Sequence, residues 1–173
     1  GLNDPAIVQF GRWAMSALTG DLGVSLKTKQ PILEMLAHRI PVTLELSILA
    51  ILFAIVVGVP LGVIAAVGRG TAVDWLISVI SISFLAVPYF WLALMLIILF
   101  TVTLGWLPPS GYVPFWDNPV GNLRLMIMPT IALGAAFVAI IARQTRASML
   151  SVLNEDYIRT ARAKGGRGAR VLW

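Results

Sequence analysis

The chain has 173 residues, of which 58% are apolar, against about 45–50% in soluble proteins. Charged residues make up 12%, against about 25%, and the mean hydropathy is +0.88. So little polar surface could not cover a soluble fold of this size, and the absence of cysteine excludes disulfides and thiolate metal sites. The composition predicts an all-α fold, a polytopic transmembrane helical bundle.

Residues 1–40 precede the first long apolar stretch and show two amphipathic patterns. Apolar side chains recur at helical spacing over 10–18 and again over 31–40, where His38 is expected at the surface. We expect two short helices that lie on the outer face of a membrane.

Three apolar stretches are long enough to cross a bilayer, whose core of about 30 Å needs about 20 helical residues. We expect the spans at about 41–67, 75–104 and 124–146, with residues 41–173 forming one transmembrane domain. A helix over the whole second stretch would exceed the core thickness. A kink or a tilt of that helix would absorb the excess.

Candidate packing, hinge and acidic positions lie within these stretches. Gly58 and Gly62 flank Pro60 and predict close helix packing, either inside the subunit or at a dimer face. Pro88 predicts a gating hinge or a static kink. Glu45 is the one acidic residue within a predicted span. It is either a functional group inside the membrane or a hydrated residue at the interface.

The distribution of charge predicts the orientation. The loop at 105–122 is rich in Pro, Gly and aromatic residues and has no Lys or Arg. Seven basic and two acidic residues follow Ala142 and account for the whole net charge of +5. Because basic residues favour the cytoplasmic side, we expect a cytoplasmic C-terminal segment and an extracytoplasmic N-terminal segment. A basic end can also indicate nucleic acid, but beside an apolar stretch we expect a bilayer partner instead.

Sequence motifs of nucleotide or metal chemistry are missing from the chain. It has no G-x-x-x-x-G-K-[ST] loop and no H-E-x-x-H. We therefore expect no catalytic residue, no metal and no cofactor on this chain, and no enzyme activity of its own. Any ATP would be bound and hydrolysed by a partner.

The segment at about 154–165 is predicted to form a short cytoplasmic helix. Acidic residues at its start and basic residues toward its end favour the helix dipole, and a glycine can end it. Charge taken alone favours a different interpretation, in which the basic block is only a solvated flank at the lipid surface. The candidate residues are Glu155, Asp156, Tyr157, Arg159, Thr160, Ala161, Ala163, Lys164 and Gly165.

This segment, E-D-Y-I-R-T-A-R-A-K-G, resembles the coupling-helix motif in permeases of binding-protein-dependent ABC importers. The resemblance is narrower to the dipeptide, oligopeptide and nickel subfamily, through G-D-L-G-V-S-L at 20–26, R-I-P-V-T-L-E-L at 39–46 and L-G-W-L-P-P-S-G at 104–111. Arg159 stands where the wider superfamily has Glu, as is usual in this subfamily. The run after Gly165 is richer in glycine than the family pattern.

The resemblance implies a six-span type I ABC importer permease (MetI-like), of which this chain would be an internal fragment with spans two to four. It implies a bacterial or archaeal plasma membrane, and peptides or similar small solutes as cargo. It also implies a homologous permease, two ATPase subunits and an extracytoplasmic solute-binding protein as partners. The candidate residues at 155–165 would then dock the ATPase. The loop at 106–116 would contact the binding protein or anchor at the interface.

Two other functions remain open from the residues alone. An ion-coupled secondary transporter would need ionisable or unwound sites near the midplane, and the uncharged cores argue against one. A membrane anchor that assembles a complex without transporting is the second alternative.

Overall fold

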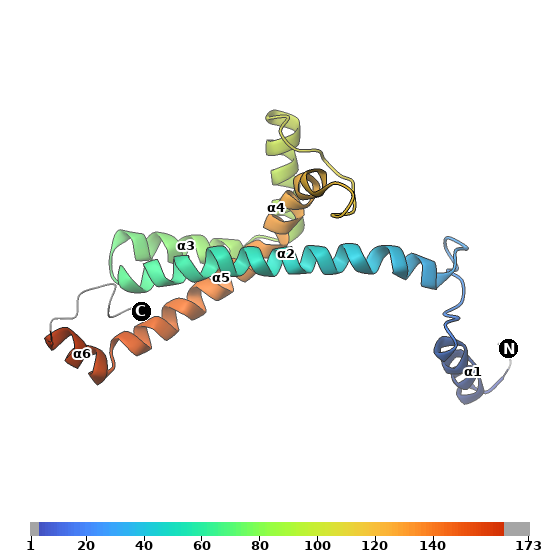
Figure 1. The fold of residues 1–173 in the computed structure, drawn as a ribbon, viewed down its shortest axis with the longest axis horizontal. Helices are drawn as coiled ribbons and strands as arrows, with labels where there is room; N and C mark the ends of the chain where they lie inside the picture. Colours follow the sequence, from blue (N-terminus) through green and yellow to red (C-terminus); the bar gives the residue numbers. More distant parts are fainter. Residues whose placement is uncertain (1–3, 165–173) are drawn as a thin grey trace. The chain divides into compact units, whose positions relative to one another are not determined.

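The computed structural model describes residues 4–164, and the chain divides into two compact units, Gly1–Glu45 and Leu46–Trp173. Within the described residues, all regular structure is helical apart from one isolated bridge between Val24 and Pro31. The predicted all-α fold is therefore confirmed (Figure 1). Two helices are long and apolar enough to span a membrane, or three if one bent pair is counted as a single span.

The first unit contains the amphipathic helix α1 (Ala6–Leu18) and a tight loop. The Phe10 and Trp13 rings on α1 lie 5.9 Å apart, and no residue of this helix is buried. In the loop, Gly20 and Gly23 adopt positive φ angles of 88° and 81°, which only glycine adopts without strain. The Gly23 N–H donates to Asp21 Oδ1 at 2.8 Å, so the G-D-L-G motif is a turn.

α2 runs from Ile32 to Val67 as one helix, so the expected separate surface helix at 31–40 is wrong. Pro41 does not begin a helix but lies inside this one, on an exposed position. A proline removes only its own N–H, and the turns on either side keep their hydrogen bonds. The uncharged part of α2, residues 46–67, is about 33 Å long at 1.5 Å per residue and can cross a bilayer.

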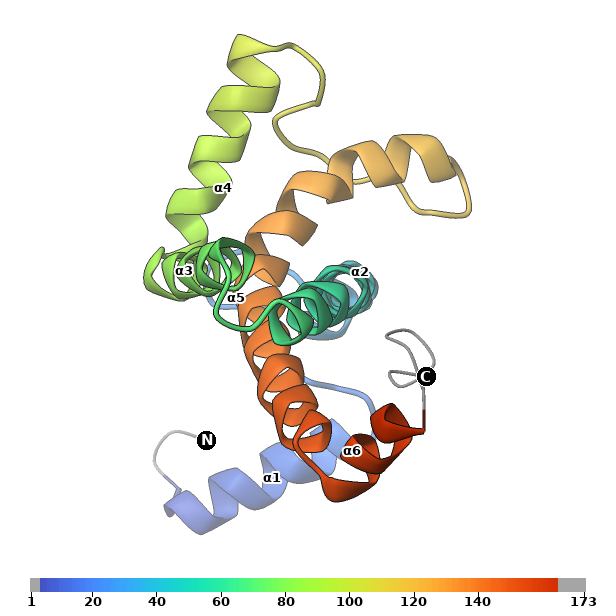
Figure 2. The same ribbon diagram turned by 90° about the vertical axis from the view of Figure 1, so that its left-hand side faces the viewer.

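In the second unit, α5 (Pro119–Leu153) contacts both α2 and α3 (Ala72–Ala86) (Figure 2). The buried side chains on the facing surfaces are small, so the backbones approach closely. On α2 these are Ala50, Ala54, Gly58, Gly62, Ala65 and Ala66, and on α5 they include Gly134, Ala135, Ala139 and Ala142. Many large apolar side chains are exposed instead, although Met126, Met128 and Val138 of α5 are buried.

The second predicted span is broken rather than gently kinked. α3 is followed by α4 (Tyr89–Ile97) and a π-helical turn, η1 (Ile98–Thr103), and the two arms meet at 101°. Pro88 disfavours the helical conformation at Val87, which adopts extended angles (φ −81°, ψ 125°). Each arm has 15 residues, about 22 Å, which is too short to cross the core alone.

α5 extends beyond the predicted span at 124–146 at both ends, and its start is fixed by specific contacts. The Asn118 side chain accepts a hydrogen bond from the Gly121 N–H at 2.9 Å, and Pro119 occupies the first helical position. Asn122, which is fully buried, donates to the Val113 carbonyl at 2.8 Å. These contacts fix the end of the loop that is rich in aromatic residues, called the aromatic loop below, onto the start of α5.

Candidate functional site

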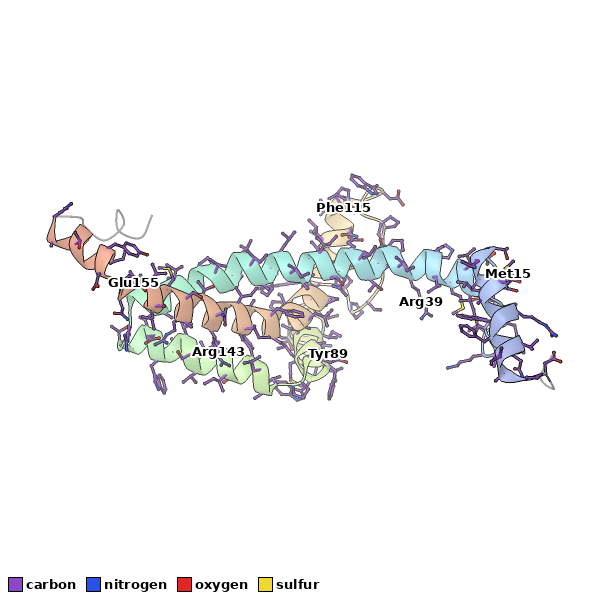
Figure 3. The ribbon with its side chains drawn as sticks, turned by 90° about the horizontal axis from the view of Figure 1, so that it is seen from below. Met15, Arg39, Tyr89, Phe115, Arg143 and Glu155 are labelled. Carbon is purple, nitrogen blue, oxygen red and sulfur yellow. The ribbon has the colours of Figure 1, made fainter. Side chains whose placement is uncertain are left out.

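The short helix α6 (Asp156–Ala163) follows α5 after a turn of two residues, Asn154 and Glu155. Asn154 Nδ2 donates to the Leu150 carbonyl at 2.8 Å, and the N–H groups of both turn residues donate to carbonyls of the last turn of α5. Figure 3 labels Glu155 at this junction. This short, hydrogen-bonded turn holds the start of α6 at the end of α5.

The two faces of α6 differ. Ile158 is 6% exposed, whereas the neighbouring Tyr157 is 61% exposed. Thr160 Oγ1 donates to the Asp156 carbonyl at 2.9 Å and stays on the helix surface. Ala163 and Lys164 are exposed as well. Gly165 and the side chains of Arg159 and Ala161, also named from the sequence, lie outside the described residues.

Gly58 and Gly62 of α2 lie against α5. A Cβ at Gly62 would lie 2.5 Å from the Ala142 carbonyl oxygen and 2.6 Å from Thr145 Cβ. A Cβ at Gly58 would lie 3.0 Å from Ile141 Cβ. Pro60, between them, lies inside α2 and is exposed.

An ion pair between α3 and α5 is the main feature that the sequence analysis missed. Arg146 Nε and Nη2 donate to the two carboxylate oxygens of Asp74 at 2.6 and 2.7 Å. The Gly70 N–H adds a third hydrogen bond to Asp74 at 3.0 Å, which ties in the α2–α3 turn. Asp74 is 7% exposed. Two parallel bonds to a carboxylate fix the angle between the partners as well as their distance.

The sequence carries a signal for this pair. Asp74 opens one apolar stretch and Arg146 follows the end of another, so each marks a boundary of a predicted span. Opposite charges at the start of one helix and the end of an antiparallel neighbour lie at the same level. Which helices are neighbours, however, is a property of the tertiary fold.

The break at Pro88 borders an apolar cavity of about 350 Å³ between α4, the aromatic loop and α5. Tyr89 and Ala93 line it from α4, and Met128 and Pro129 line it from α5. Figure 3 shows Tyr89 where α3 gives way to α4. Glu45, the acid noted from the sequence, is half-buried in α2.

Over residues 4–164, no three His, Cys, Asp or Glu side chains gather closely enough to hold a metal ion. Long apolar helices, small-residue packing and an ion pair between helices together define a polytopic membrane protein.

Residues 58–173 match the binding-protein-dependent transport system inner membrane component family, and the chain belongs to that family. The family resemblance drawn from the sequence is thereby confirmed.

Several relatives are similar to the whole chain. It is 45% identical over 172 residues to a peptide transport system permease protein of Brucella suis, covering 99% of this chain and 55% of that protein. It is 41% identical over 193 residues to a dipeptide transport system permease protein of Alkalihalophilus pseudofirmus, covering 100% and 58%. It is 39% identical over 176 residues to an oligopeptide transport system permease protein of Bacillus subtilis, covering 100% and 56%. The chain thus spans a little more than half the length of these relatives.

Proposed function

We propose that this chain is part of the membrane-spanning permease of an ATP-driven importer for peptides or similar small solutes. It forms half of a translocation path with a homologous permease, receives solute from an extracytoplasmic binding protein, and is driven by two ATPase subunits. The names of the similar permeases support peptides as the class of cargo. The chain itself carries out no covalent chemistry.

The observation that carries this proposal is α6, which is joined to a long span by a bonded two-residue turn. We infer that α6 lies in the cytoplasm and docks into a groove of the ATPase through its exposed face, with Tyr157 at the centre. Closure of the nucleotide sites would then move α6, and through the short turn it would move α5. The basic residues that follow Ala142 favour this side of the membrane.

The experiment is a detergent pull-down with the full-length subunit as bait. Replacing residues 155–165 by a Gly/Ser linker of equal length should abolish copurification of the ATPase, while the homologous permease is retained. No ATPase with either bait would contradict the proposal, and a secondary transporter or a plain anchor would take its place.

Two adjacent substitutions make the test sharper. Tyr157→Ala removes an exposed ring and should release the ATPase without lowering the amount of folded subunit. Ile158→Ala removes a buried side chain of the same helix and should lower stability instead. Equal effects of the two substitutions on ATPase binding would mean that the exposed face is not the docking face.

A further inference from the structure

A cleft of about 690 Å³ opens between α3 and α5 beside the Asp74–Arg146 pair. Its lining includes Ser78 and Ile82 from α3, and Ile140, Arg143, Gln144 and Arg146 from α5. Figure 3 shows Arg143 on the part of α5 that runs beside α3.

The chemistry of the cleft changes in one direction along the helices. The ion pair lies at one end, and Ser78, one turn further along α3, lies near the level of Arg143 and Gln144. One more turn leads to Ile82 and Ile140, which are 60% and 52% exposed. The cleft is therefore basic and polar at one end and apolar at the other.

The polar end has hydrogen-bonding capacity that the chain does not use. Arg146 is occupied by Asp74, but within residues 4–164 the side chains of Arg143, Gln144 and Ser78 make no hydrogen bond or ion pair. The nearby Ser81 donates its hydroxyl to a carbonyl one turn back, at 2.8 Å. Because Asp74 and Arg146 neutralise each other, the cleft keeps the positive charge of Arg143.

The position of Arg143 along α5 places this charge at a membrane surface. Residues 125–142 are uncharged and would extend about 27 Å, close to the thickness of the hydrocarbon core, and Arg143 is the first charge after them. Phosphate groups of lipids lie at this level, and basic pockets between transmembrane helices bind anionic head groups.

We propose that the cleft binds an anionic phospholipid. Its phosphate accepts hydrogen bonds from Arg143, with Ser78 and Gln144 as further donors, and an acyl chain lies along Ile82 and Ile140. A free anion would use only the polar end, so the exposed apolar end favours a lipid as the occupant. This site is independent of ATPase docking by α6.

The test uses the full-length subunit, purified in detergent with the subunits that copurify, and native mass spectrometry to titrate phosphatidylglycerol or phosphatidylcholine. Arg143→Gln keeps hydrogen-bonding capacity but removes the charge. The matched control is Arg124→Gln, which removes the same charge from the same helix outside the cleft. Gln144→Glu is a second, nearly isosteric variant that repels a phosphate.

We expect phosphatidylglycerol to bind in preference to phosphatidylcholine. Arg143→Gln should weaken this binding about tenfold, because the hydrogen bond to the phosphate loses the charge of its donor. Gln144→Glu should weaken it as well. Arg124→Gln should leave it unchanged, and millimolar inorganic phosphate should not compete. The proposal would be overturned by unchanged affinity in both cleft variants or by displacement of lipid by inorganic phosphate. It would also be overturned if no lipid binds because another helix covers the cleft.

Discussion

Gly62→Ala tests how closely α2 and α5 approach. The new methyl group would lie 2.5 Å from the Ala142 carbonyl oxygen, whereas ordinary van der Waals contact begins at 3.4 Å. The obstacle is backbone, so no side-chain rotation relieves the clash. The two helices must separate by about 0.9 Å at this level, the difference between those two distances.

Two opposing terms set the magnitude. Forcing an extra methyl group into a packed interface costs about 1–3 kcal/mol. Replacing glycine by alanine inside a helix recovers up to about 1 kcal/mol. We therefore expect a net loss of about 1–2 kcal/mol for Gly62→Ala. Gly58→Ala should lose less, because its nearest contacts are at 3.0 Å and include the side chain of Ile141.

The assay is the temperature at which half of the detergent-solubilised full-length subunit remains monodisperse, with about 2–4 °C expected for each kcal/mol. Gly11→Ala is the control, because it is also a helical glycine but has no atom within 4 Å of a new methyl group. It should not lower the midpoint. If Gly62→Ala is no less stable than Gly58→Ala or the unsubstituted protein, α2 and α5 do not meet as closely as described.

The remaining predictions concern the ion pair and the start of α5. Asp74→Asn leaves Arg146 without its carboxylate and should cost about 2–3 kcal/mol, below the range of about 3–5 for fully buried pairs because the Arg146 side chain is 30% exposed. The same thermal assay would measure it, and exchanging the two charges in a double variant should recover part of the loss. Asn118→Ala removes the side chain that caps α5 and should cost about 1 kcal/mol. Thermal midpoints of Asn118→Ala and Asn118→Ser would check this, since serine can also cap; equal losses would argue against capping.

Most of the secondary structure could be predicted because it depends on local composition. The uncharged run over 46–67 can be stable only as a helix in lipid, where every backbone group must find a partner within its own segment. α6 was also predictable, since its charges are ordered along the helix dipole. The predicted start of a new helix at Pro41 was wrong because a single missing N–H does not outweigh the intact turns around it.

The chain's sequence by itself determined that this is a helical membrane protein of a transport family, because hydropathy, charge bias and motifs are properties of neighbouring residues. Only the tertiary structure decided that Asp74 meets Arg146, that Gly62 touches the backbone of α5, and that the second span bends by 101° at Pro88. These features depend on which helices become neighbours and at what level. That choice follows from packing between segments that are 72 residues apart or more, which no local pattern records.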